Sequence, residues 1–186
     1  TRAIDELLQI GVEGIIIMCV HDENYNSKVL QLVVERFPIV TIDRQLKGIP
    51  LSFVGTNNEE AARELANYLL NEGYKKICFA MPASRETSTI VDRQNGLTMA
   101  FREHGMIADE SLWITDLKAT LPSSRSEENL ERDMRRITKF MESHREVEAF
   151  FAVEYSIARI IYRCLYHMNL HKKCPVVCFD SSDNII

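Results

Sequence analysis

The sequence predicts an α/β protein built from parallel sheets, and two observations lead to that prediction. Short apolar runs of strand length alternate with longer segments that repeat apolar residues at helical spacing. Such alternation is typical of parallel sheets joined by right-handed crossovers. In addition, the strand predicted at 51–54 leads through Gly55 and Thr56 directly into a helix start at Asn57, with no separate loop. We therefore expect the chain to cross at this point from one sheet to a second.

The first half, up to about residue 56, is predicted to hold two helices and three strands. The opening helix has one apolar face and can end at Gly11, and a buried strand follows at 12–20. The second helix is predicted at 27–36. The β-branched run at 39–42 fits a strand that is covered on both faces. The apolar residues expected to face inward are Ile4, Leu7 and Leu8 in the first helix and Leu30, Val33, Val34 and Phe37 along the second.

The second half begins with Asn57 and Glu60, whose spacing is that of a capping box. We expect helices that end at Gly73 and Gly105, strands at 75–81, 112–115, 148–153 and 175–179, and a second capping box at Ser124 and Glu127. The expected inward-facing residues are Ala61, Ala62, Leu65, Ala66, Leu69 and Leu70, then Leu97, Ala100 and Phe101, then Leu130, Met134, Ile137 and Met141, then Ile157, Ile160, Ile161, Leu165 and Met168.

Composition favours an ordinary soluble globular protein. The chain has 186 residues, of which 46% are hydrophobic and 26% are charged, enough for one large domain or two small ones. The longest apolar runs are far shorter than the roughly 18 residues of a membrane-spanning helix, so we expect no membrane partner. The net charge of −5 argues against nucleic-acid binding by these residues, because phosphate contact needs clustered Lys and Arg.

The five cysteines suggest a reducing compartment, because several lie in apolar runs where a thiol behaves as a small hydrophobe. Cys164, His167, His171 and Cys174 have ligand types and spacing that suit zinc. However, Cys164 belongs to an apolar helical pattern, and the histidines suit the end of that helix. We therefore expect no metal.

Polar residues follow three predicted strands directly, namely Asp43, Glu154 and Asp180. Ligands in open parallel sheets bind beyond the carboxyl ends of the strands, so these positions are candidates for a binding site. Arg93, near the start of a helix, can point its guanidinium toward the same edge. The alternatives are an Asp43–Arg44 pair in a solvated turn and an ion pair of Arg93 with Asp92 or Glu86.

The sequence gives no support to catalysis. It contains neither a glycine-rich phosphate loop nor a nucleophile elbow, and no nucleophile is accompanied by a base. We expect no cofactor.

Six segments, in order, resemble the effector-binding core of the lactose-repressor/galactose-repressor family of bacterial transcription regulators. These are GVEGIIIM, FPIVTIDR, VGTNNEEAARELANYLLNEGYKKICF, DRQNGLTMAFREHG, AFFAVEYSIA and PVVCFD. The resemblance covers almost the whole chain. It implies the type I periplasmic-binding-protein fold, with two Rossmann-like lobes and parallel sheets, incomplete here at both ends.

By that comparison, residues 1–56 are part of the amino-terminal lobe and residues 57–186 are an incomplete carboxyl-terminal lobe. A helix-turn-helix domain that binds operator DNA has no counterpart in this chain. The family further implies a cytoplasmic homodimer and a small effector held between the lobes, a sugar in preference to a purine.

The resemblance also suggests site residues. Asp43 and Asp180 match family aspartates that follow strands, and Arg93 matches the arginine of an R-x-x-G pattern that grips sugar hydroxyls. Thr89 stands four residues earlier on the same effector loop. Glu154 departs from the family, which usually has Asn-Asp where this chain has Glu154 and Tyr155, so the effector differs or Glu154 pairs with a residue such as Arg159.

The main hypothesis is therefore the non-catalytic, effector-binding core of a transcription regulator, most simply a repressor. One alternative is a periplasmic sugar-binding protein of a transporter, and another is a doubly wound enzyme that processes sugars or nucleotides.

Overall fold

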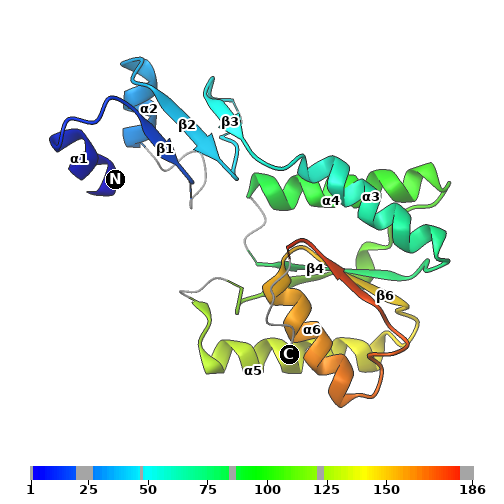
Figure 1. The fold of residues 1–186 in the computed structure, drawn as a ribbon. Helices are drawn as coiled ribbons and strands as arrows, with labels where there is room; N and C mark the ends of the chain where they lie inside the picture. Colours follow the sequence, from blue (N-terminus) through cyan, green and yellow to red (C-terminus); the bar gives the residue numbers. More distant parts are fainter. Residues whose placement is uncertain (1, 20–26, 47, 84–86, 121–123, 181–186) are drawn as a thin grey trace. The chain divides into compact units, whose positions relative to one another are not determined.

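The chain folds into two compact units in the computed structural model, which describes residues 2–19, 27–46, 48–83, 87–120 and 124–180. Unit 1 comprises Thr1–Asn58 and Glu86–Asp92, and unit 2 comprises Glu59–Arg85 and Arg93–Ile186. Each unit contains one parallel sheet (Figure 1). The expected α/β class with parallel sheets is confirmed, whereas the lobe boundary at residue 56 stays a prediction.

Unit 1 has a sheet in the order β1-β2-β3, and every neighbouring pair is parallel. Its elements are α1 (Arg2–Gln9), β1 (Ile15–Ile17), α2 (Ser27–Val34), β2 (Ile39–Ile42) and β3 (Ser52–Val54). Gly11 has a φ of +78°, which is the left-handed conformation expected of a residue that ends a helix. The strand expected at 12–20 is much shorter, and its last position lies outside the described residues.

Among the described residues, the helices of unit 1 cover one face of its sheet, so the expectation that the strand at 39–42 is buried on both faces is wrong. Ile15 and Ile39 are paired in register and pack with residues of α1 and α2 in one buried cluster. On the opposite face the side chains of Ile16 and Val54 are 71% and 65% exposed. Successive side chains along a strand point to opposite faces, so the covering helices can bury only alternate positions.

The buried face of α2 also differs from the expected one. Val29 and Leu32 are buried, whereas Leu30 is 40% exposed and Val34 is 83% exposed. Val29, Leu30, Leu32, Val33 and Val34 make five of the eight helical residues apolar, so helical spacing alone fits more than one inward direction.

Unit 2 has a sheet in the order β5-β4-β6-β7, again parallel throughout. Figure 1 shows α3 and α4 on one side of this sheet and α5 and α6 on the other. The elements are α3 (Asn58–Asn71), β4 (Ile77–Pro82), α4 (Ser88–Glu103), a 3₁₀ turn η2 (Glu110–Leu112), β5 (Ile114–Leu117), α5 (Glu127–Ser143), β6 (Ala149–Ala152), α6 (Tyr155–His167) and β7 (Val176–Cys178). The central strands β4 and β6 are buried along their whole length, as parallel strands between two helical layers must be.

Most predicted helix faces of unit 2 are confirmed. Leu97, Ala100 and Phe101 are buried, and the positive φ angles of Gly73 and Gly105 mark the ends of α3 and α4. The predictions for α5 were less accurate, because Leu130 and Met134 are only partly buried.

Two boundary predictions in unit 2 are wrong. The segment expected as a strand at 112–115 is a 3₁₀ turn followed by β5, which begins at Ile114. The cap of α5 is Ser126, whose hydroxyl accepts a hydrogen bond from the Asn129 backbone N–H, and not Ser124. Both serines precede the acidic first turn, so the sequence offers two cap positions, and helix α5 starts after the second.

Helices long and apolar enough to cross a membrane are absent from the residues that the structure describes.

Candidate functional site

The carboxyl edge of the unit 2 sheet carries two of the predicted site residues. Strands β6 and β7 run parallel and in register, with Ala152 opposite Cys178 at their ends. Glu154 and Asp180 each follow two residues after these positions, so the topology brings both to the same edge. Asp180 is exposed and has a φ of +68°, a conformation that aspartate tolerates better than most residues.

Arg93 joins this edge from the second turn of α4. Its Nη1 donates a short hydrogen bond to the carbonyl oxygen of Val153, directly before Glu154. Its guanidinium carbon also lies 3.9 Å from the centre of the Phe179 ring, directly before Asp180. The main-chain bond and the aromatic face hold the guanidinium at the ends of both strands. Glu86, one of its predicted alternative partners, lies outside the described residues.

Glu154 occupies the N-cap position of α6. Its Oε2 accepts a hydrogen bond of 3.2 Å from the hydroxyl of Ser156. The guanidinium of Arg159, the partner suggested from the sequence, lies 6.0 Å from the centre of the Tyr155 ring. The Glu154 side chain is partly buried at this cap position, one residue after the carbonyl that Arg93 binds.

Thr89 lies one helical turn before Arg93 in α4, and its side chain is 8% exposed. Residues four apart share a face of a helix, so the hydroxyl and the guanidinium project along the same side of α4. Contact clustering places Thr89 with unit 1 and Arg93 with unit 2.

Asp43 ends β2 in the sheet of unit 1. Its backbone has a φ of +63°, its N–H donates to the carbonyl of Val54 at 3.0 Å, and its carboxylate lies 3.9 Å from Nε of Arg44. The pair with Arg44 is therefore present, and the Asp43 side chain is still 56% exposed. Asp43 and Asp180 thus share a left-handed backbone after a parallel strand in two separate sheets.

Two contacts at the edge could not be foreseen from the sequence. The Val153 carbonyl is a main-chain atom, which no residue type announces. The sequence places Phe179 at the end of the strand predicted at 175–179. The contact of its ring with the Arg93 guanidinium depends on where α4 lies, which the sequence does not specify. The aromatic residue just before Asp180 was the one available signal.

Cys164 and Cys174, two of the four residues with zinc-like spacing, are buried free thiols. The Cys164 thiol is buried and lies 3.7 Å from the Met134 carbonyl, and no group of three His, Cys, Asp or Glu side chains suited to a metal exists among the described residues. All five cysteines are free. Burial raises the pKa of Cys78 well above its usual range and raises that of Cys174 to about 12, so both remain protonated and inert.

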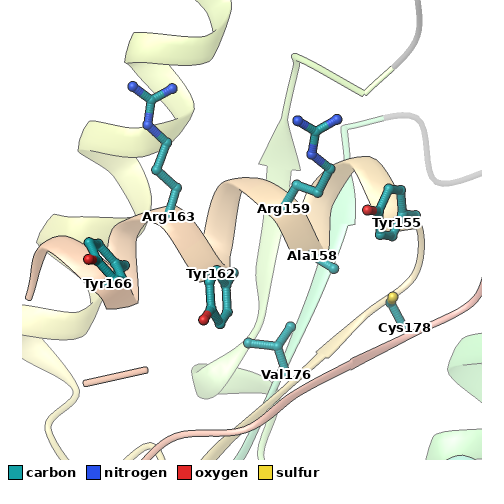
Figure 2. A pocket seen from close by; sticks show the side chains of 8 residues that line it. All are labelled: Tyr155, Ala158, Arg159, Tyr162, Arg163, Tyr166, Val176 and Cys178. Atoms are coloured by element: carbon teal, nitrogen blue, oxygen red, sulfur yellow. The ribbon is translucent and has the colours of Figure 1, made fainter. Parts of the chain in front are cut away.

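A separate groove of about 630 Å³ lies along α6 and β7. Figure 2 shows Tyr155, Tyr162 and Tyr166 along α6, with Arg159 and Arg163 extending from the same helix and Val176 and Cys178 on β7. Tyr162 and Tyr166 are 37% and 58% exposed. The groove contains none of the predicted ligand-binding residues. We name it the α6 groove.

Comparison with known proteins decides the family. A family profile described as periplasmic binding proteins and sugar binding domain of LacI family matches residues 1–182. The chain belongs to this family. No curated protein sequence matches it.

Solved structures of LacI-family and related proteins share the fold. The transcriptional regulator CelR in complex with cellobiose aligns with a TM-score of 0.77 and 21% identity, over 97% of this chain and 53% of that one. The glucose-galactose binding protein GanP from Geobacillus stearothermophilus gives 0.77 and 19%, over 98% and 62%. The Escherichia coli transcriptional repressor ascG gives 0.71 and 20%, over 97% and 62%. These structural alignments show the type I periplasmic-binding-protein fold, and the chain spans between about half and two thirds of each structure's length.

Proposed function

We propose that this chain is the effector-binding core of a LacI-type transcription regulator, most simply a repressor, that binds a small polyhydroxylated effector and has no catalytic activity. The family match over residues 1–182 is the observation that carries the proposal. In the whole protein, the effector lies between two lobes and changes the affinity of a separate DNA-binding domain for its operator.

The proposed effector is a sugar, held by Thr89, Arg93, Glu154 and Asp180 from one lobe and by Asp43 from the other. The fixed guanidinium of Arg93 can donate paired hydrogen bonds to neighbouring hydroxyls, and the carboxylates can accept them. Such matching gives specificity, because a buried polar group left without a partner costs about 1–3 kcal/mol. Three carboxylates around one arginine favour a neutral sugar over an anionic ligand.

Calorimetry on the whole protein with a panel of sugars and nucleobases tests this proposal. We expect heat from one sugar or a small set of related sugars. Arg93→Ala should weaken that binding by roughly 5- to 150-fold, the equivalent of about 1–3 kcal/mol. Arg102→Ala is the matched control, because Arg102 lies on the same helix in its last turn and is exposed. Absence of heat from every panel member would contradict the proposal.

The alternative is a periplasmic sugar-binding protein of a transporter, and the likeness to a glucose-galactose binding protein keeps it open. Five free thiols favour the regulator, because disulfides form readily in the periplasm and a reducing cytoplasm preserves thiols. The gene sequence upstream of Thr1 discriminates between the two. A helix-turn-helix supports the regulator, and a secretion signal supports the transport protein.

An enzymatic role is the third possibility. Incubation of the whole protein with any sugar that binds, followed by product analysis, is expected to return the sugar unchanged. Turnover that Asp43→Asn abolishes would instead support the enzyme.

We also propose a cytoplasmic homodimer. The α6 groove supports it, because Tyr and Arg are enriched at protein interfaces and three tyrosines and two arginines line this surface. Light scattering of the whole protein should give twice the monomer mass, and Tyr166→Glu should raise the monomer fraction. Tyr68→Glu is the control, because Tyr68 on α3 is equally exposed at 58%. A monomeric wild type would exclude the dimer.

A further inference from the structure

A second cavity in unit 2 lies at the amino ends of the strands, away from the edge that carries Arg93. It has a volume of about 300 Å³ and opens where β5 begins and α5 ends. Its lining combines cations, aromatic rings, hydroxyls and an imidazole, namely Ser111, Trp113, Arg136, Lys139, Phe140, Ser143 and His144. We call it the α5 pocket. A cavity of this size accommodates a small ligand.

Lys139 and Arg136 supply the positive charge of the α5 pocket. Within the described part of the chain, the Lys139 ammonium takes part in no ion pair. Arg136 binds Asp116 through Nε at 3.2 Å, so its two terminal nitrogens remain available. Asp116 in turn is shared with Arg132 at 3.5 Å. The single negative charge of Asp116 is therefore shared by two guanidinium groups. Because one carboxylate cannot neutralise both, the pocket remains positively charged.

Asp109, which contacts Ser111 of the pocket wall, is also paired. Asp109 accepts the Ser111 hydroxyl at 2.6 Å and lies 3.7 Å from Nζ of Lys76. These contacts hold the pKa of Asp109 below its usual range, chiefly through the Ser111 hydrogen bond. Asp109 is therefore an ion that is already neutralised by a partner outside the pocket.

The polar side chains of the α5 pocket offer acceptors more than donors. The Ser143 hydroxyl donates to the carbonyls of Lys139 or Phe140, at 2.9 and 3.1 Å, and the Ser111 hydroxyl donates to Asp109. His144 Nδ1 lies 3.0 Å from the Phe140 carbonyl oxygen and 3.2 Å from the Ser143 hydroxyl oxygen. The carbonyl can only accept, so the tautomer that satisfies it carries its hydrogen on Nδ1, and in that tautomer Nε2 is an acceptor. Lone pairs on the serine oxygens and on Nε2 suit a ligand that brings its own hydroxyl groups.

Aromatic rings complete the wall. Phe140 is 3% exposed and stacks on the His144 ring at 4.2 Å, and Trp113 packs against Phe79 at 5.3 Å. Phe140 is therefore buried support for the His144 ring, and the partly exposed Trp113 indole gives the C–H face of a sugar or polyol an apolar surface to lie against.

We propose that the α5 pocket binds a small phosphorylated polyol, such as a sugar phosphate, at a site separate from the effector site. Lys139 and Arg136 bind the phosphate, Ser143 and His144 accept hydrogen bonds from the polyol hydroxyls, and Trp113 lies against its carbon skeleton. A neutral sugar lacks the anion that the two cations require, and inorganic phosphate lacks the hydroxyls.

Tryptophan fluorescence of the whole protein tests this site, because Trp113 is the single tryptophan of the 186 residues and lines the pocket. The probes are glucose 6-phosphate, inorganic phosphate and glucose, each at the same ionic strength so that screening is constant. The signal is the difference between the wild type and Trp113→Phe. We expect a saturable change with glucose 6-phosphate, a weaker one with phosphate and none with glucose.

Single substitutions distinguish binding at the α5 pocket from binding at the proposed effector site. Lys139→Gln should weaken glucose 6-phosphate binding about tenfold, the equivalent of one charge-assisted hydrogen bond, and Arg93→Ala should leave it unchanged. Lys173→Gln is the matched control, because Lys173 is an exposed lysine of the same unit outside the pocket. The proposal is overturned if glucose 6-phosphate gives no saturable change up to about 10 mM, weaker than ordinary ligand affinities, or if Lys139→Gln binds as the wild type does.

Discussion

Asp133 is a carboxylate that helical spacing alone gives no reason to bury. Its side chain is fully buried on α5, where it accepts hydrogen bonds from the backbone N–H groups of Lys118 and Ala119 at 2.8 and 2.7 Å and from Arg132 at 2.8 Å. One charged side chain thus fixes the segment that leaves the carboxyl end of β5. Buried carboxylates persist only where their lone pairs are satisfied in this way.

Replacement of Asp133 by alanine should destabilise the protein by about 3 kcal/mol, because it leaves backbone donors without an acceptor beside α5. Asp133→Asn keeps one acceptor oxygen and should lose less. Urea unfolding measures both. The control is Glu131→Ala, since Glu131 is 62% exposed and forms a surface ion pair with Arg135, and we expect a change of no more than about 0.5 kcal/mol. Equal losses for Asp133→Ala and Glu131→Ala would disprove the assigned role.

The residues of the candidate site show what sequence can and cannot predict. Glu154 and Asp180 were found because parallel strands place their carboxyl ends at one edge. The contacts of Arg93 with Val153 and Phe179 were not found, since they depend on how far α4 lies from the sheet.

At the scale of the elements, Gly96 sets the approach of α4 to α3. A Cβ atom at this position would lie 2.1 Å from the Glu59 carbonyl oxygen and 2.8 Å from the Ala62 Cβ. Both separations are shorter than van der Waals contact, and the carbonyl is backbone that cannot rotate away. The glycine is therefore needed for close packing of the two helices, and Arg93 lies three residues before it on α4.

Gly96→Ala should destabilise the protein by about 1–3 kcal/mol, although alanine is the better helix former, because the overpacking outweighs a propensity gain of about 1 kcal/mol. The shift of α4 should also weaken effector binding. Thermal unfolding and calorimetry measure the two effects. Asn95→Ala, an exposed position next to it, should leave both nearly unchanged. A Gly96→Ala protein as stable as the wild type would show that the helices can separate without cost.

Glu148 joins the amino ends of β4 and β6. Its carboxylate accepts the N–H groups of Lys75 and Lys76 at 2.6 and 3.0 Å, and these bonds lower the pKa of Glu148. A pKa that is lower in the folded state means that the ionised form stabilises the fold. This contribution is present above the unfolded pKa of about 4.3 and is lost as the pH falls through the folded value.

Glu148→Gln should therefore lower the melting temperature at pH 7, and the difference from the wild type should close as the pH falls below about 4. Melting curves between pH 3 and 7 check this, on the scale of the glutamate titration. Glu146→Gln, also exposed, is the control and should give a small offset at neutral pH. A gap that stays constant across this range would mean that the charge of Glu148 contributes nothing.

The buried face of a helix could be predicted where its apolar residues are confined to one side. In α4, Leu97, Ala100 and Phe101 stand among polar neighbours, so one direction is defined. In α2 the apolar residues surround most of the helix, and only the sheet decides which of them are buried. The prediction of the α5 cap was wrong for a similar reason. Two serines precede the helix, and which of them caps it depends on hydrogen bonds that form only in the folded loop.

At the scale of the whole molecule, two parallel sheets each carry an aspartate in a left-handed conformation beyond a strand, at Asp43 and Asp180. The sequence predicted two sheets because the strand predicted at 51–54 leads directly into a helix start at Asn57, with no separate loop. It could not predict that one face of the first sheet is exposed, since a β-branched run reads the same whether one face or both are covered.

The proposed effector is held by residues of both sheets, and that part of the proposal has a consequence for function. If the effector binds one arrangement of the lobes more tightly than the other, it raises the population of the first arrangement. The size of this shift is set by the difference between the effector's binding free energies for the two arrangements. Coupling of this kind is typically about 1–3 kcal/mol, or roughly 5- to 150-fold in operator affinity.

We expect the effector identified by calorimetry to change operator affinity of the whole protein within this range, measured by fluorescence anisotropy at fixed salt. Arg93→Ala should bind operator normally but lose the response, whereas Arg102→Ala should keep both. An effector that binds tightly yet leaves operator affinity unchanged in the wild type would contradict a regulatory role and favour the transport protein.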